Sequence, residues 1–412
     1  MRPGVPIGAA RDLPLWRRPV TLLFVMATTM PIAFYAWYAL LNNFVIEADG
    51  FDGADIGLLH TVREIPGFAA IGVIAILLFV REQVLGLISL MLLGLATAVT
   101  AWFPHLTGLL TLTFLSSLGF HYYETVNQSL QLQWLPKERA PQMLGWLMGA
   151  GSATTLVVFV LIVLMWDTLS LSHNVVFMAA GLTTAAAAAF CLLAYPQFDS
   201  PHPQLKQMVL RRRYWLYYAL QFMSGARRQI FMVFAGFMMV ERFGFEVHEL
   251  TGLYLVNLVV TMGVAPFLGR AVGWYGERRM LILEYAGLTL VFLAYGGIYW
   301  FGWGAALAAA LYIVDHILFG LALALALKTY FQKITDPQDI APTAAVAFTI
   351  NHIAAVFLPV ALGLLWVVSP AAVFGLAACM AMTSLGLALL IPRHPEPGHE
   401  TILSGLAPTP AE

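Results

Sequence analysis

Two adjacent arginines, Arg227 and Arg228, lie in the middle of the apolar stretch QFMSGARRQIFMVFAG at residues 221–236. A guanidinium group stays charged and pairs with a carboxylate or phosphate through two parallel hydrogen bonds. Because a charge at the centre of a bilayer costs about 3 kcal/mol, such groups face a protein interior or water. Consecutive helical residues point about 100° apart, so the two arginines face different surroundings. We interpret Arg228 as an anion-binding or gating residue, with a structural ion pair to Asp315 or Glu124 as the alternative. For Arg227, the alternative to a functional role is an ion pair inside the helix bundle.

Other ionisable residues within apolar stretches have types that suit proton transfer. A carboxylate in an apolar interior and a histidine near neutral pH both exchange protons readily. His121 and Glu124 are three residues apart and therefore share one face of a helix. The alternative is that the acids only neutralise the arginines. We predict the substrate-binding residues Arg228, Arg227, His121, Glu124, Asp315 and His316, and the proton-coupling residues Glu124, Asp315, His121 and His316.

A third polar group is HTVREIPG at residues 60–67, where Arg63 and Glu64 precede Pro66. Proline inside a helix removes a backbone hydrogen bond and kinks the chain. Adjacent opposite charges beside a kink indicate local gating or packing chemistry more than direct substrate contact. We predict a gating role for Arg63 and Glu64.

The overall composition determines the class of protein. Of the 412 residues, 60% are hydrophobic and only 10% are charged, with a mean hydropathy of +0.80. A water-soluble globular chain does not have this composition, so we predict an all-α integral membrane protein in contact with the lipid bilayer. The net charge of −1 gives no basic excess for a nucleic-acid partner.

Apolar stretches long enough to cross a bilayer, about 20 residues each, recur along the chain. We predict both termini in the cytoplasm, because 17 of the 21 Lys and Arg residues then fall inside, counting Lys328 at the inner end of the span 303–330, whereas Arg242 alone falls outside and three lie deep within spans. We expect a multi-pass protein of the plasma membrane, namely a bacterial inner membrane. The twelve predicted transmembrane helices are 20–44, 55–79, 84–104, 107–134, 142–166, 173–195, 214–240, 249–269, 280–301, 303–330, 341–368 and 370–392.

A polar interruption divides these helices into two six-helix bundles. The Pro-rich segment 196–213 ends in three arginines and is typical of a cytoplasmic linker. It separates an N-terminal bundle at 20–195 from a C-terminal bundle at 214–392. Residues 1–19 form a cytoplasmic N-terminal segment, and residues 393–412 have no apolar period and are expected to be disordered. His121 and His316 lie at nearly equal depth in the two bundles, which favours duplicated halves.

The segment GRAVGWYGERR at residues 269–279 resembles the cytoplasmic loop pattern of the major facilitator superfamily (MFS) of secondary transporters. Spaced glycines permit a tight reversal, and the terminal arginines stay at the anionic inner surface. The resemblance covers about residues 15–393 and implies the MFS fold, with a central cavity lined by the first, fourth, seventh and tenth helices. It also implies gating roles for Gly269, Gly273, Gly276, Arg278 and Arg279.

We therefore predict a secondary transporter, monomeric and without cofactors, that moves a small anionic or zwitterionic solute by alternating access and is coupled to protons. One alternative is a proton-coupled exporter of cationic or lipophilic compounds. A copper importer is another, since thioethers bind Cu(I) and methionines such as Met26 and Met30 lie one turn apart. A third is a receptor or assembly factor that transports nothing. No catalytic or metal residues are predicted, because the phosphate-binding loop, the Gly-x-Ser-x-Gly elbow and the His-Glu-x-x-His zinc motif are all missing from the sequence.

Overall fold

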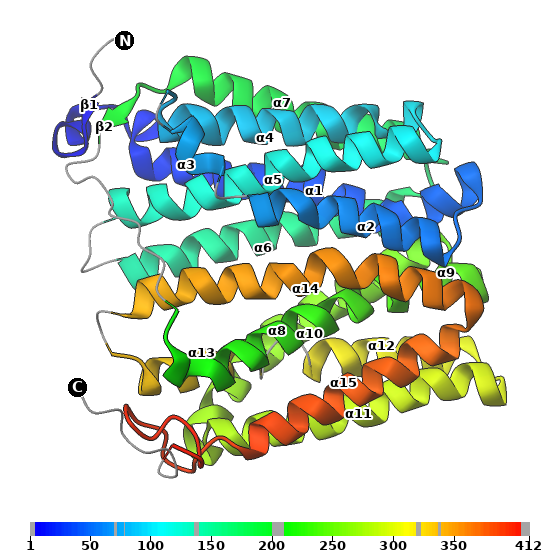
Figure 1. Ribbon diagram of the computed structural model, residues 1–412. Coiled ribbons are helices and arrows are strands. Elements are labelled where there is room, and N and C mark those ends of the chain that lie inside the picture. Colours follow the sequence, from blue (N-terminus) through cyan, green and yellow to red (C-terminus); the bar gives the residue numbers. More distant parts are fainter. Residues whose placement is uncertain are drawn as a thin grey trace. The chain divides into compact units, whose positions relative to one another are not determined.

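The computed structural model describes residues 5–69, 72–77, 79–135, 140–199, 210–318, 323–336 and 339–404, which are mostly helical (Figure 1). The chain divides into two compact units. Unit 1 contains Met1–Phe51, Val62–Leu205 and Glu246–Leu255, and unit 2 contains Asp52–Thr61, Lys206–Phe245 and Val256–Glu412. Two helices therefore change unit along their length: α2 begins in unit 2, and α10 begins in unit 1.

Unit 1 is built mainly from long helices and carries one small sheet. The strands β1 (Val5–Pro6) and β2 (Phe198–Asp199) pair in parallel, with Val5 opposite Phe198. The helices are α1 (Pro19–Asp49), α2 (Gly53–Phe68), α3 (Gly72–Ile76), α4 (Glu82–Val99), α5 (Leu106–Trp134), α6 (Ala140–Met165) and α7 (His173–Ala194).

Unit 2 begins with a helix that contains an irregular turn. A π-helical segment, η6 (Ile230–Ala235), lies between α8 (Trp215–Gln229) and α9 (Gly236–Phe243). Single π-turns inside helices occur frequently at functional sites, and this one begins at Ile230, two residues after Arg228. The other helices are α10 (Val247–Tyr275), α11 (Glu277–Phe301), α12 (Ala305–Ile317), α13 (Leu323–Ile334), α14 (Ile340–Val368) and α15 (Pro370–Leu389).

Eight of the described helical segments are long and apolar enough to cross a membrane. This finding supports the predicted multi-pass membrane protein. The other four predicted spans, at 55–79, 107–134, 214–240 and 303–330, are those that carry the predicted charged site residues. Ionisable residues lower the hydropathy of these four spans. Three of the four spans are also divided between shorter elements. The count of twelve membrane crossings remains a prediction.

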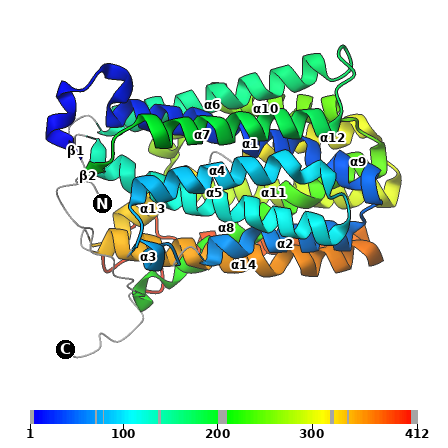
Figure 2. The same ribbon diagram turned by 90° about the horizontal axis from the view of Figure 1, so that it is seen from above.

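Close helix packing in unit 1 depends on small residues. The main contacts of α4 are with α5 and α7, while α1 packs on α6 and α7 (Figure 2). Gly94 and Gly181 bring the backbones of α4 and α7 together: a Cβ atom built on Gly181 would lie 2.4 Å from the Gly94 carbonyl oxygen. Small residues at such contacts let membrane helices approach closely.

We expect Gly181→Ala to destabilise the protein by about 1–3 kcal/mol, because the added methyl group overpacks this contact. The measurement is thermal unfolding of the purified protein in detergent. Gly145→Ala in α6 is the matched control, since a Cβ at Gly145 meets nothing within 4 Å. Equal melting temperatures for the two variants would contradict the close approach of α4 and α7 at Gly181.

The main helix pairings of unit 1 have counterparts in unit 2. In unit 2, α8 packs on α14 and α11 packs on α15. Counted within each half, α8 and α14 belong to the first and fifth predicted spans, as α1 and α6 do. Likewise, α11 and α15 belong to the third and sixth spans, as α4 and α7 do. The shared pairing supports the interpretation of the two bundles as duplicated halves.

Chain segments on either side of the C-terminal bundle are also ordered. Arg211, at the end of the predicted linker, donates to Asp339 through Nε (3.0 Å) and Nη2 (3.1 Å). These hydrogen bonds lower the pKa of the Asp339 carboxyl group. Residues 200–209 of the linker and residues 1–4 lie outside the described residues.

The described part of the C-terminal tail differs from the expected disorder. Residues 393–404 form turns that return to the bundle, and the Tyr330 hydroxyl donates to the Glu400 carbonyl oxygen at 2.7 Å. The Ile402 N–H donates to the Leu390 carbonyl, and Thr401 is buried. The expectation of disorder from residue 393 is therefore wrong for residues 393–404, because side-chain contacts with α13 replace the missing apolar period. Residues 405–412 lie outside the described residues.

Candidate functional site

A buried ion pair joins α8 and α11 in unit 2. The side chain of Arg227 is 1% exposed, and that of Glu284 is completely buried. Arg227 Nη1 donates to Glu284 Oε1 at 3.2 Å, and its guanidinium lies 5.4 Å from the centre of the Tyr285 ring. Two charges removed from water in this way stabilise a fold only because each compensates the other. The structure thus places Arg227 in the packed interior of its unit.

Glu284 was not among the predicted site residues. The signal was present in the sequence, because Glu284 is the only acidic residue in the predicted span 280–301. The expected partners of the arginine pair were Asp315 and Glu124 instead. An acidic residue isolated in an apolar span is itself a candidate partner for a buried arginine.

A second acid, Asp315 on α12, is buried close to this pair. Its side chain has no exposure, and neither carboxylate oxygen has a hydrogen-bond partner among the described residues. The charge of Arg227 acts on Asp315, and Asp315 in turn interacts electrostatically with Tyr295. A buried carboxylate without hydrogen bonds is costly when ionised. Unit 2 therefore brings two of the predicted site residues, Arg227 and Asp315, together with Glu284.

The remaining predicted site residues of unit 2 are less deeply buried. His316 is half-buried, and its Nε2 lies 3.0 Å from the Thr261 hydroxyl oxygen. Its ring centre lies 5.6 Å from that of Phe231 in the π-helical segment. Arg228 is half-buried whereas Arg227 is fully buried, so the two arginines have different surroundings, as their helical spacing predicts.

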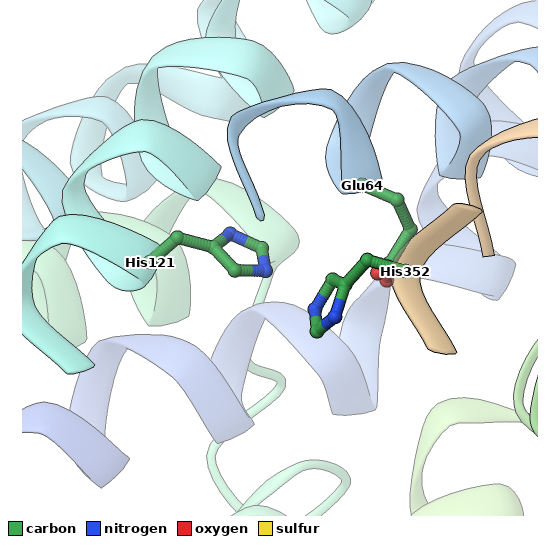
Figure 3. A group of neighbouring side chains, drawn as sticks. All are labelled: Glu64, His121 and His352. Atoms are coloured by element: carbon green, nitrogen blue, oxygen red, sulfur yellow. The ribbon is translucent and has the colours of Figure 1, made fainter. Parts of the chain in front are cut away.

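In unit 1, α2 and α5 place three predicted site residues near one another. Figure 3 shows Glu64 on α2 and His121 on α5, with a carboxylate oxygen and a ring nitrogen within 4.8 Å of each other. Arg63 forms an ion pair with the adjacent Glu64. The Ser117 hydroxyl donates to the Arg63 carbonyl oxygen and lies 3.0 Å from His121 Nδ1. His352, also labelled in Figure 3, belongs to unit 2.

Arg63 also lines a small pocket inside unit 1. Arg63 shares this pocket with serine and threonine residues of α5 and with aromatic residues of α1 and α5. Arginine and hydroxyl groups suit the polar end of a solute, and rings suit its apolar part. The other lining residues are Phe34, Trp37, Thr113, Ser116, Ser117 and Phe120.

Glu124 lies one turn after His121 on α5. It is half-buried, and its Oε1 accepts a hydrogen bond from Gln128 Nε2 at 3.0 Å. His121 and Glu124 therefore continue into a polar stripe along one side of α5. The stripe combines an imidazole, a carboxylate and an amide on one face of the helix.

The glycine pattern at 269–279 lies mostly within helices. Gly269 and Gly273 fall inside α10, which ends at Tyr275, and the surroundings of Gly269 are not described. Gly276 makes the actual reversal, with φ +80°, a backbone conformation that favours glycine. Gly269 was already the last residue of the predicted span 249–269, whereas Gly273, expected in the loop after it, lies within α10 instead. Arg278 is half-buried, and Arg279 is exposed.

The first residues of α4 and α11 form matching contacts in the two units. Glu277, the first residue of α11, forms an ion pair with Lys333 of α13 at 2.7 Å. Glu82, the first residue of α4, accepts a hydrogen bond from Gln133 Nε2 of α5 at 2.7 Å. Each acid joins the start of its helix to the end of a neighbouring helix. Neither contact was predicted from the sequence.

Comparison with known proteins places these features in a wider context. The sequence model of the Major Facilitator Superfamily matches residues 19–337. No curated protein is significantly similar to the chain in sequence.

Solved structures of transporters share the fold. A mutant form of the nucleoside transporter NupG gives a TM-score of 0.72 at 14% identity, covering 90% of this chain and 99% of that chain. A POT family transporter in complex with 5-aminolevulinic acid gives 0.64 at 14% identity, covering 90% and 94%. A D-xylose–proton symporter gives 0.67 at 10% identity, covering 91% and 97%.

Proposed function

Because this chain belongs to the Major Facilitator Superfamily, we propose that it moves a small anionic or zwitterionic solute by alternating access, coupled to protons. The chain is a multi-pass membrane transporter and not an enzyme. Our proposal includes twelve transmembrane helices, both termini in the cytoplasm and a location in the bacterial inner membrane.

The observation that carries proton coupling is Asp315, fully buried beside an arginine that already has a partner. Arg227 donates a hydrogen bond to Glu284 and also acts electrostatically on Asp315. If both acids were ionised, this group would hold two negative charges and one positive charge in a dry interior, which is unfavourable by several kcal/mol. Since Glu284 holds the hydrogen bond, we assign the exchangeable proton to Asp315.

A similar argument selects the residue that binds the solute. Arg227 is engaged inside unit 2, so Arg228 is the better candidate for contact with a substrate anion. A guanidinium binds carboxylate or phosphate bidentately. His316 in unit 2, and His121 and Glu124 in unit 1, supply further polar groups for the solute.

Two of the solved transporters with the same fold bear on separate parts of this proposal, one on protons and the other on the charge of the solute. One is a symporter of D-xylose and protons, and another holds 5-aminolevulinic acid, which carries both an amine and a carboxylate. At these identities the likeness shows the fold alone. The residues of this chain carry the argument.

We expect Arg228→Ala to lower the affinity for the solute by roughly tenfold to a hundredfold, because a hydrogen bond to a charged group contributes about 1.5–3 kcal/mol. The solute is first identified by the rise in melting temperature of the purified protein over a panel of carboxylates, phosphates, amines and metal ions. Uptake of the labelled solute into proteoliposomes is then measured for the wild type and the variant.

Arg393→Ala serves as the control, since Arg393 is exposed, lies outside the predicted spans and should leave uptake unchanged. Unchanged anion uptake in Arg228→Ala would contradict the proposed role of Arg228. If Arg228→Ala still exports cations or lipophilic compounds, the alternative function of a proton-coupled exporter is favoured.

A further inference from the structure

Three side chains with metal-binding atoms converge in unit 1 outside the residues discussed so far. Asp167 lies in the turn after α6, Glu246 lies between α9 and α10, and His248 lies in the first turn of α10. All three belong to unit 1, which includes Glu246–Leu255. One ligand atom from each lies within 4.8 Å of the others.

The separations within this group match metal ligation better than hydrogen bonding. His248 Nδ1 lies 3.4 Å from Asp167 Oδ2 and 3.5 Å from Glu246 Oε2. Two ligands bound tetrahedrally to zinc at about 2.0–2.1 Å are separated by about 3.4 Å. A hydrogen-bonded ion pair is shorter, about 2.7–2.9 Å. His248 Nδ1 is shielded from solvent and makes no hydrogen bond among the described residues.

The local backbone holds the ligands in place. Gly244, with φ +68°, ends α9 and turns the chain toward Glu246. The Glu246 N–H donates to Glu249 Oε2 at 3.0 Å and fixes the start of α10. His248 is therefore carried by a capped helical turn, which limits its freedom before an ion binds.

Further charges around the group add to its negative potential. Glu246 and Glu47 interact electrostatically, and His173 Nδ1 lies 3.8 Å from Glu47 Oε2. Three carboxylates and two imidazoles thus gather in one region. A divalent cation would relieve the repulsion between Asp167 and Glu246, and the imidazole favours a transition metal over Ca²⁺ or Mg²⁺.

We propose that Asp167, Glu246 and His248 bind a divalent transition-metal ion of the Zn²⁺ class. The side chains of Asp167 and Glu246 are 63% and 66% exposed, so the ion retains access to water for its remaining ligand position. Binding joins the end of α6 to the start of α10. The site shares no residue with the proposed substrate and proton sites, so its test is independent of theirs.

The test is titration of the purified, chelator-treated full-length protein in detergent with Co²⁺, which replaces Zn²⁺ and absorbs visible light when tetrahedral. We expect one equivalent of Co²⁺ to bind with a visible absorption band that Zn²⁺ abolishes. Loss of a ligand in His248→Ala or Asp167→Asn should weaken binding at least about tenfold. His248→Cys should retain binding, because a thiolate is also a zinc ligand.

The control is His105→Ala, which removes an exposed histidine outside the group and should leave binding unchanged. Melting temperatures measured without metal show whether each variant is folded. The proposal is overturned if the wild type shows no saturable Co²⁺ band. It is equally overturned if folded His248→Ala binds as the wild type does, or if His173→Ala removes binding while His248→Ala does not.

Discussion

Replacing Glu284 with alanine is expected to destabilise the protein by about 3–5 kcal/mol, because Arg227 then remains buried without its ion-pair partner. Arg227 is 1% exposed, so water cannot replace the lost carboxylate without opening the unit. The effect is measured on the purified protein in detergent, by thermal unfolding and by size-exclusion chromatography. This is the largest change in stability that we expect from one substitution.

A double variant separates the ion pair from the space that it fills. With Arg227→Met and Glu284→Met together, neither partner of the ion pair is left behind as an unpaired charge, and stability should return close to that of the wild type. If the double variant is as unstable as the sum of the two single variants, the residues act independently and the ion pair between α8 and α11 is wrong.

Replacing Asp315 with asparagine is expected to abolish accumulation driven by a pH gradient while leaving solute exchange intact. Asparagine has nearly the shape of a protonated aspartic acid but cannot release a proton. For coupling of one proton to one solute, a difference of one pH unit stores about 1.4 kcal/mol and supports up to about tenfold accumulation. In Asp315→Asn, the accumulation in proteoliposomes should fall to the passive level.

Exchange of labelled for unlabelled solute is the control, since it needs no net proton movement. Asp315→Asn proteoliposomes should retain it, which shows that the variant is folded and binds solute. Glu124→Gln provides the comparison in unit 1. Loss of accumulation in Glu124→Gln with full accumulation in Asp315→Asn would move the proton site from unit 2 to unit 1.

Much of the helical organisation could be predicted from hydropathy and from the distribution of basic residues. Each predicted span overlaps helical structure, because runs of about 20 apolar residues have few other stable forms in a bilayer. Breaks within spans could not be predicted. The span 214–240 contains the π-helical segment Ile230–Ala235, and this segment itself contains neither Gly nor Pro.

The candidate site was predicted in part. Buried charges were found because ionisable residues inside apolar spans are conspicuous, and Arg227 and Asp315 do lie close together in unit 2. Their geometry was not predicted, since pairing between Arg227 and Glu284 depends on which faces of α8 and α11 meet. The contacts of Glu277 with Lys333 and of Glu82 with Gln133 were not predicted for the same reason, because residues distant in sequence meet only after the helices pack.

Movement of protons with the solute tests the central proposal most directly. Wild-type proteoliposomes carry a pH-sensitive dye inside, with no initial pH gradient, and receive an inward gradient of the solute identified by thermal stabilisation. We predict a change of internal pH that follows solute entry in the wild type and is missing in Asp315→Asn, although both take up labelled solute. Solute uptake by the wild type without any change of internal pH would contradict proton-coupled transport.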